Sequence, residues 1–447
     1  MRSIYAAGLI ALLMAPCAQA QTISRSTLGN GLTVLAVQSD HAQVAGIAAV
    51  VGASGAHESN ATRGSRALLQ QMLSIASHDA VVEKLSPISG VVGPAGSAGL
   101  GVNTNFDFVE AAYAVSVEEL DEGLALFADQ LFEVELTEED LDQSRDLTVR
   151  SFEAAQESPV QVTFDLFRAA LYGDSAMAQP QQGDPESLEA ITLADLQSFR
   201  DTYYVPSNTW LCIVSPLRVE EASAAVSRAF GGVASRPAPP AAPEPVLPSE
   251  SLVEVGDSPA LVQASLVIGV PLPSCNDPIF PAAEVLTQLL EGPGGRLHRD
   301  LHLLTALGLA LPTRLLDEHY PINVLSVQPA RDPFLAVHTL AAPRAIEAAR
   351  AGVLRHIFAL RTGAATEDEL ARAKARVINA HRLSTQRPSD TALYLARRSF
   401  FGLAGADEAI AAVEAVTSED LNAVAKQYFG RHAVGIQMPS TQAGGQL

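Results

Sequence analysis

The chain contains few cysteines. Only Cys17, Cys212 and Cys275 occur among its 447 residues, whereas a small scaffold built on disulfides would carry many more. This scarcity excludes a disulfide-built fold. Cys17 lies in a segment that we expect to be removed, so two thiols remain. We expect both to be buried or free, although in an oxidising compartment they could pair.

Basic side chains are also scarce. Lys and Arg together number 29 against 50 Asp and Glu, which gives a formal net charge of -21. Such a surface repels phosphate backbones and offers no broad basic area. The composition therefore predicts that nucleic acid is not a partner.

Long apolar runs are absent after the first twenty residues, so we expect no transmembrane segment. Residues 1–20 combine an early Arg2, an apolar run from Ala6 to Met14, and small residues at Ala18 and Ala20. This layout is typical of a secretory signal peptide cleaved after Ala20. We expect a periplasmic or secreted protein.

The chain is long enough for more than one domain. Its hydrophobic content of 48% supports a large core, and a chain of this size tends to divide into domains. Residues 236–250 are dense in proline, which predicts an extended, semi-rigid linker. We therefore expect an N-terminal domain over residues 21–235, a C-terminal domain over 251–440, and a tail over 441–447.

The two sides of the linker share helix-start signals. Thr137 is followed three positions later by Asp140, and Thr366 is followed three positions later by Glu369. Each pair is a capping box that predicts the start of an amphipathic helix. The same signal occurs at Thr192 and again at Thr417, about 225 residues later. Two correspondences at nearly one offset favour a duplication.

Each half mixes strand and helix patterns. Residues 31–38 and 44–53 are β-rich, and apolar residues then recur at helical spacing over 120–131. The second half starts similarly with a β-rich run at 261–270. Strand groups followed by helix pairs predict an α+β fold, with each unit a mainly antiparallel sheet that has helices on one face. We expect the two layers to face each other.

Several segments in this order resemble the pitrilysin/insulinase family of inverzincin metallopeptidases, which includes mitochondrial processing peptidase and the core proteins of the cytochrome bc complex. They are the strand "LGNGLTVLAVQ", the turn "GASGAHE", a helix starting near Gly64, the half-ends "TYY" and "QYF", and the mid-chain linker. The resemblance covers nearly the whole mature chain. It implies two duplicated LuxS/processing-peptidase-like domains.

The family binds zinc through H-x-x-E-H, with both imidazoles on one helical face and the glutamate as general base. That pattern places Ala67 and Gln71 at the two histidine positions and Gln70 at the glutamate position. Glutamine is a poor zinc ligand and cannot accept a proton at neutral pH. The third ligand falls in the window 148–151, which has no carboxylate, although Glu153 is close by. We therefore predict neither a metal nor a catalytic residue in this chain.

Active relatives also supply an Arg and a Tyr that hold the substrate backbone. The resemblance implies Arg296 for the arginine, which is our candidate substrate-binding residue, but places Leu311 at the tyrosine position. Glu291–Gly295 is at best an abbreviated form of the glycine-rich loop of processing-peptidase alpha subunits.

Three other patterns are open to a functional interpretation. His298 and His302 have the i, i+4 spacing of metal ligands, but a solvated helix is the simpler interpretation. The segment Gly90–Gly101 is glycine-rich without the Lys-Ser/Thr of a phosphate loop, which favours a surface loop. The adjacent pair His57-Glu58 is expected in a solvated loop.

The resemblance and the vacant motif predict a non-catalytic member of the family. We expect it to pair with a zinc-bearing paralogue as a heterodimer, to have no cofactor of its own, and to help form a chamber that binds peptide or unfolded polypeptide for proteolysis. One alternative is a structural subunit like the cytochrome bc core proteins. Another is an active zinc peptidase with a non-standard site at His298 and His302.

Overall fold

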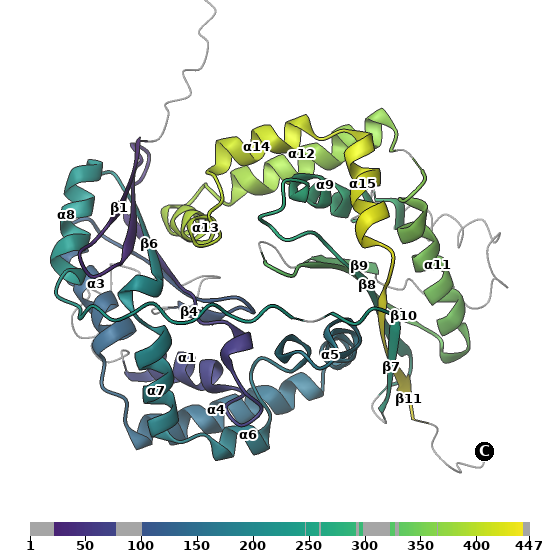
Figure 1. The fold of residues 1–447 in the computed structure, drawn as a ribbon, viewed down its shortest axis with the longest axis horizontal. Coiled ribbons are helices and arrows are strands. Elements are labelled where there is room, and N and C mark those ends of the chain that lie inside the picture. The colour runs from purple at the N-terminus through teal and green to yellow at the C-terminus, as the bar shows by residue number, and fades with distance from the viewer. Residues whose placement is uncertain are drawn as a thin grey trace, which may run out of the picture.

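The computed structural model describes residues 22–76, 101–245, 247–258, 261–291, 295–297, 322–326, 330–363 and 365–440. These residues form two α+β halves that lie side by side (Figure 1). The predicted fold class, with duplicated domains, is confirmed. Among the described residues, no helix has both the length and the apolar character needed to cross a bilayer.

The N-terminal sheet has the strand order β1-β2-β6-β3-β5-β4. Only β2 and β6 run parallel, and the other neighbours are antiparallel. The strands are β1 (Thr22–Thr27), β2 (Thr33–Gln38), β3 (Ala45–Val51), β4 (Gly101–Thr104), β5 (Val109–Val115) and β6 (Thr209–Ser215). The helices of this half are α1 (Ser65–Ala76), α3 (Leu120–Ala128), α4 (Glu138–Gln156), α5 (Pro159–Tyr172), α6 (Pro185–Ala190), α7 (Leu193–Tyr203) and α8 (Val219–Phe230).

The C-terminal sheet has the order β7-β11-β8-β10-β9, again with one parallel pair, β7 and β11. Its strands are β7 (Leu252–Ser258), β8 (Ala264–Pro271), β9 (Ile322–Ser326), β10 (Phe334–Ala341) and β11 (Ala433–Pro439). The helices are α9 (Phe280–Leu290), α11 (Ile346–Ala359), α12 (Glu367–Leu383), α13 (Pro388–Phe400), α14 (Ala406–Ala415) and α15 (Ser418–Tyr428). This order repeats β2-β6-β3-β5-β4, with the parallel pair at the same place, so the duplication extends to the topology.

The helix starts follow the predicted local signals. Thr137, Thr192, Thr366 and Thr417 each accept a hydrogen bond from the backbone N–H three residues later, and each acidic partner accepts one from the threonine N–H. Two otherwise unpaired backbone donors are thereby satisfied at each start. The four capping boxes are confirmed.

Each sheet is covered by helices of its own half on one face, as predicted, and by one helix of the other half on the opposite face. Helix α5 packs on β7, β8 and β11 of the C-terminal sheet, and α13 packs on β3, β5 and β6 of the N-terminal sheet (Figure 1). The two helices start 229 residues apart, at Pro159 and Pro388. This reciprocal exchange, which the sequence did not predict, joins the halves.

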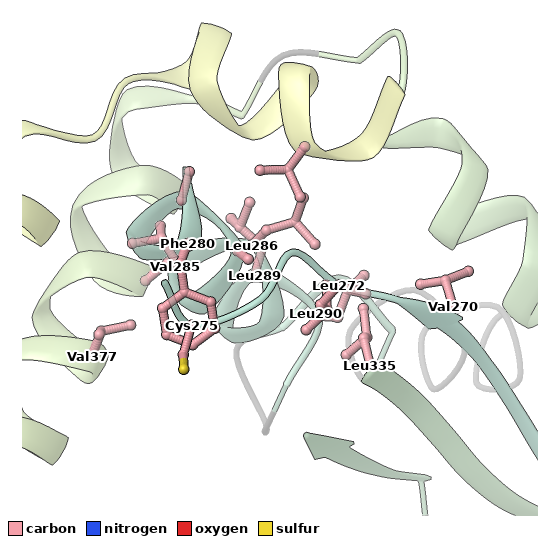
Figure 2. Packing of buried hydrophobic residues seen from close by; sticks show 14 of the residues in the cluster. Val270, Leu272, Cys275, Phe280, Val285, Leu286, Leu289, Leu290, Leu335 and Val377 are labelled. Carbon is pink, nitrogen blue, oxygen red and sulfur yellow. The ribbon is translucent and has the colours of Figure 1, made fainter. Parts of the chain in front are cut away.

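The buried hydrophobic residues form one cluster under the N-terminal helices, a larger one that runs from the inner face of the N-terminal sheet into the C-terminal helices, and a small third one between α5 and the C-terminal sheet. Figure 2 shows part of the larger cluster, to which α9 contributes Phe280, Leu286 and Leu290 and α12 contributes Val377. Cys212 and Cys275 lie in this cluster as free, buried thiols, as expected. Burial raises the pKa of the Cys275 thiol to about 12, so it is unreactive at neutral pH.

Candidate functional site

The candidate site is a half-buried face of α1. Leu68, Leu69, Met72 and Leu73 face the core, which leaves Ala67, Gln70, Gln71 and Ser74 partly exposed on the other side. Their spacing of i, i+3, i+4 and i+7 places them on one helical face. The structure therefore brings together the three positions that the sequence assigned to the family's metal motif.

Gln70 is held by its surroundings. Its Oε1 accepts a hydrogen bond from the Thr104 hydroxyl at the end of β4, and the Ser74 hydroxyl donates to the Gln70 carbonyl at 3.0 Å. The amide thus ties α1 to the edge strand. A neutral amide cannot accept a proton at neutral pH, so Gln70 cannot replace a glutamate as general base.

Helix α4 supplies the neighbouring surface, because it packs against α1. Its buried polar residues are Ser144 and Thr148, and the Thr148 hydroxyl donates to the Ser144 carbonyl at 2.8 Å. Glu153 is exposed to solvent on another face of α4. A shifted alignment therefore does not bring Glu153 to the site as a third ligand.

The side chains on this face of α1 and beside it do not fit a zinc site. An alanine, two amides and a threonine hydroxyl provide neither the imidazoles nor the carboxylates that a zinc site uses. In the parts of the chain that the structure describes, no three His, Cys, Asp or Glu side chains lie close enough to hold a metal ion. We therefore derive no hydrolytic step for this face.

The first turn of α1 contains a buried ion pair. Arg66 is fully buried, and its Nε lies 3.4 Å from Oε2 of Glu58, whose side chain is 4% exposed. Oε1 of Glu58 accepts a hydrogen bond from the Arg66 backbone N–H at 2.8 Å, and the Arg66 Nη1 donates to the Asn105 carbonyl. This pair fixes the start of α1 against the loop before β5, which positions the whole candidate face.

The segment "GASGAHE" is built around this pair. Ser54 caps the short helical turn Gly55–His57, and the His57 Nδ1 accepts from the Ser54 N–H at 3.1 Å. A Cβ on Gly55 would lie 2.7 Å from the Arg66 Nη2, so glycine leaves room for the guanidinium. The expectation of a solvated His57-Glu58 pair was wrong, because Glu58 is buried against Arg66.

His57 also contacts the "TYY" half-end. Its ring stacks on Tyr203 of α7, with centroids 4.3 Å apart. Two segments that carried the family resemblance therefore meet beside α1. A glycine two residues ahead of a His-Glu pair, followed by an arginine at a helix start, is the trace of this cluster in the sequence.

Arg296 lies in the C-terminal half and is engaged within that half. Its Nε and Nη2 lie 3.2 and 2.8 Å from the carboxylate oxygens of Glu369, the capping residue of α12. The role of Arg296 in substrate binding stays a prediction. His298, His302, Leu311, most of Gly90–Gly101 and the middle of Glu291–Gly295 lie outside the described residues.

Acid is expected to weaken folding through His57. Burial, with smaller contributions from Arg66 and Arg331, lowers the pKa of His57 from 6.5 to about 4. Between these values the unfolded chain binds a proton that the folded chain does not, so stability falls as the pH drops through this window. His57→Gln should remove that part of the pH dependence. The measurement is the urea midpoint of variant and parent from neutral pH to about 4.

The matched control for this prediction is His41→Gln, because His41 is exposed on the surface. The gap between the His57→Gln variant and the parent should narrow or reverse as the pH falls, while the control tracks the parent. A gap that does not change with pH would count against a buried, neutral His57.

Two halves of one topology, joined by exchanged helices and carrying a helix face without the expected zinc ligands, define an M16-type peptidase fold. The family model described as the peptidase M16 inactive domain matches residues 190–377, from the end of α6 into α12. The resemblance to the pitrilysin/insulinase family is thereby confirmed, and residues 190–377 are similar to the inactive domain of the M16 peptidases.

Curated relatives are distant. An uncharacterised zinc protease of Mycobacterium leprae is 24% identical over 311 residues, which are 67% of each chain. A probable mitochondrial-processing peptidase subunit beta of Arabidopsis thaliana is 23% identical over 212 residues, or 47% of this chain and 39% of that one.

Solved structures share the fold over nearly the whole chain. A protease from Helicobacter pylori has a TM-score of 0.80 at 18% identity, covering 94% of this chain and all of that one. The peptidase M16 inactive domain from Pseudomonas fluorescens has a TM-score of 0.78 at 19% identity, covering 95% and 100%. A chain of complex III2 from Candida albicans has a TM-score of 0.75 at 15% identity, covering 94% and 96%.

Proposed function

We propose that this protein is a non-catalytic M16-type subunit that pairs with a zinc-bearing paralogue and helps to form a peptide-binding chamber for proteolysis. The observation that carries the proposal is the face of α1. The sequence motif assigns Ala67, Gln70 and Gln71 to the family's metal and base positions, and the three residues share one face of α1. A chain with this fold could close a chamber and bind peptide without holding metal.

The proposal includes export. The N-terminal sequence favours a signal peptide cleaved after Ala20, so we propose a mature protein that begins at Gln21 in the periplasm or outside the cell. N-terminal sequencing of the protein from its native host checks this step. A chain that still carries Met1 would contradict it.

The decisive experiment is to purify the protein from its native host, identify what comes with it, and measure zinc content and peptide cleavage with and without that partner. We expect a zinc-free chain that has no activity alone and raises the activity of a copurified paralogue. Stoichiometric zinc and cleavage by the lone chain would overturn the proposal.

Paired variants sharpen this test. Replacing the motif glutamate of the partner by glutamine should abolish cleavage by the complex, because the general base is then lost. Gln70→Ala and Gln71→Ala in this chain should leave the cleavage rate unchanged. If either variant abolished cleavage while the complex stayed assembled, the face of α1 would have a chemical role.

A structural role in a larger assembly is the second candidate. The likeness to a chain of complex III2 from Candida albicans favours it. Recovery of the protein in a large assembly without peptidase activity would support this candidate over the first.

A further inference from the structure

A cavity of about 230 Å³ lies in the C-terminal half, between α9, α12 and α13. It is separate from the face of α1. Phe280, Val377 and Ala380 form its apolar wall, and Figure 2 labels the first two of these. Ala380 is exposed, so the cavity opens to solvent there. Its volume is below the roughly 300–1,000 Å³ of sites for drug-sized ligands, which suits a smaller molecule.

Two polar groups of the cavity wall, the buried His381 Nε2 and the partly exposed Glu284 carboxylate, lie close together. The side chains of Glu284 and His381 are 15% and 9% exposed, and the Glu284 Oε1 lies 3.7 Å from the His381 Nε2, beyond hydrogen-bond distance. The His381 Nε2 has no hydrogen-bond partner. Among the described residues, none donates a hydrogen bond to the Glu284 carboxylate. A buried polar atom is normally paired, so the unpartnered His381 Nε2, with the Glu284 carboxylate beside it, marks a place for a ligand.

The other nitrogen of His381 limits what that ligand is. The His381 Nδ1 lies 3.0 Å from the Tyr394 hydroxyl. In the tautomer in which Nδ1 carries the proton and donates it to Tyr394, the Nε2 lone pair faces the Glu284 carboxylate. Two acceptors then converge on one point, and a primary ammonium group, with three N–H donors, satisfies both.

The same cavity carries positive charge. Arg397 is neutralised by the buried Glu110, with 2.5 Å between Nη2 and Oε1. Arg398 donates its Nε to the Ala404 carbonyl and lies 5.4 Å from the Tyr394 ring centroid, and no described carboxylate pairs with it. The Arg398 guanidinium, which has no described carboxylate beside it, disfavours a divalent cation in this cavity and can bind the carboxylate of a ligand.

We propose that this cavity binds a free apolar α-amino acid. The ammonium group lies between Glu284 and His381, the carboxylate contacts Arg398, and the side chain packs on Phe280 and Val377. The proposal does not depend on whether the protein pairs with a peptidase, because the residues of the cavity come from this chain alone.

Calorimetric titration of the purified full chain with leucine, leucinamide and N-acetyl-leucine tests the proposal. We expect leucine to bind with one site per chain, and both blocked derivatives to bind about tenfold more weakly or not at all, since each loses a charge-assisted contact. Glu284→Gln should weaken leucine binding by about tenfold. Glu347→Gln, on the exposed surface of α11, is the matched control and should leave leucine binding unchanged.

A second variant distinguishes a loss of leucine binding from a loss of folding. Ala380→Trp adds bulk at the exposed mouth of the cavity and should abolish leucine binding without lowering the thermal midpoint. Absence of leucine binding to the parent chain, or equal binding of leucine and N-acetyl-leucine, would overturn the proposal. So would tight binding of zinc alone that Glu284→Gln removes. Tighter binding of leucyl-glycyl-glycine than of leucine would instead assign the cavity to a peptide amino terminus.

Discussion

Replacing Arg66 by methionine is expected to lower the free energy of unfolding by about 3–5 kcal/mol, because it leaves a buried carboxylate without its partner charge. Arg66 is fully buried, and the side chain of its partner Glu58 is 4% exposed. The Asn105 carbonyl also loses its guanidinium donor. Urea unfolding followed by circular dichroism measures the loss.

The loss should depend on pH in a defined direction. Burial raises the pKa of Glu58, while the charge of Arg66 opposes that rise. Without Arg66 the pKa of Glu58 rises further, so the folded variant takes up a proton that the unfolded chain releases. The variant should therefore recover stability relative to the parent as the pH is lowered towards the ordinary glutamate range.

Two further variants separate charge burial from lost packing. Arg66→Met combined with Glu58→Gln removes the buried charge and keeps an acceptor for the Arg66 backbone N–H, so it should regain most of the loss. Arg63→Met breaks a partly exposed pair with Asp184 and should cost only about 0–1 kcal/mol. If Arg63→Met and Arg66→Met lowered the free energy of unfolding equally, the buried pair would contribute no more to stability than the partly exposed pair.

Local signals in the sequence predicted much of the fold. A capping box such as Thr137 and Asp140 acts within four residues, so its sequence is enough to place the start of α4. The repetition of these signals in the two halves of the chain predicted the duplication. The parallel pairing of β2 with β6 joins residues 177 positions apart, such as Thr33 and Trp210, and no local pattern specifies it.

The candidate site was only partly predictable. The three positions Ala67, Gln70 and Gln71 came from the family motif, and their common face follows from helical spacing. Arg66 was missed, because an arginine at a helix start is most often exposed, and its burial depends on Glu58, Gly55 and the loop before β5. Outside the site, the contact between β3 and α13 left a signal in the sequence. Gly46 interrupts a β-rich run, and such a glycine often marks a close approach of another backbone.

Gly46→Ala is expected to lower the free energy of unfolding by about 1–3 kcal/mol or more, because α13 occupies the space that a Cβ needs. That Cβ would lie 2.1 Å from the Pro388 carbonyl carbon and 2.3 Å from the Ser389 nitrogen. Backbone atoms cannot rotate away as a side chain can, so the first turn of α13 must move off β3. Urea unfolding measures the loss, and hydrogen exchange should show faster exchange in α13.

The duplication predicts a matching effect on the other sheet. A Cβ on Gly435 of β11 would lie 2.4 Å from the Thr163 carbonyl oxygen and 2.5 Å from the Phe167 nitrogen of α5. Gly435→Ala should therefore destabilise the chain similarly and loosen α5. Gly232→Ala, with no heavy atom within 4 Å of its Cβ, is the control and should be neutral.

The hydrogen-exchange rates of α5 and α13 in the two glycine variants show whether the helices dock independently of each other. Faster exchange confined to α13 in one variant and to α5 in the other would show that each helix docks on the opposite sheet as a separate unit. Faster exchange in both helices from either change would show that the halves separate together. If Gly46→Ala had the same midpoint and exchange as Gly232→Ala, α13 would not lie against β3 in solution, and the reciprocal exchange would be wrong.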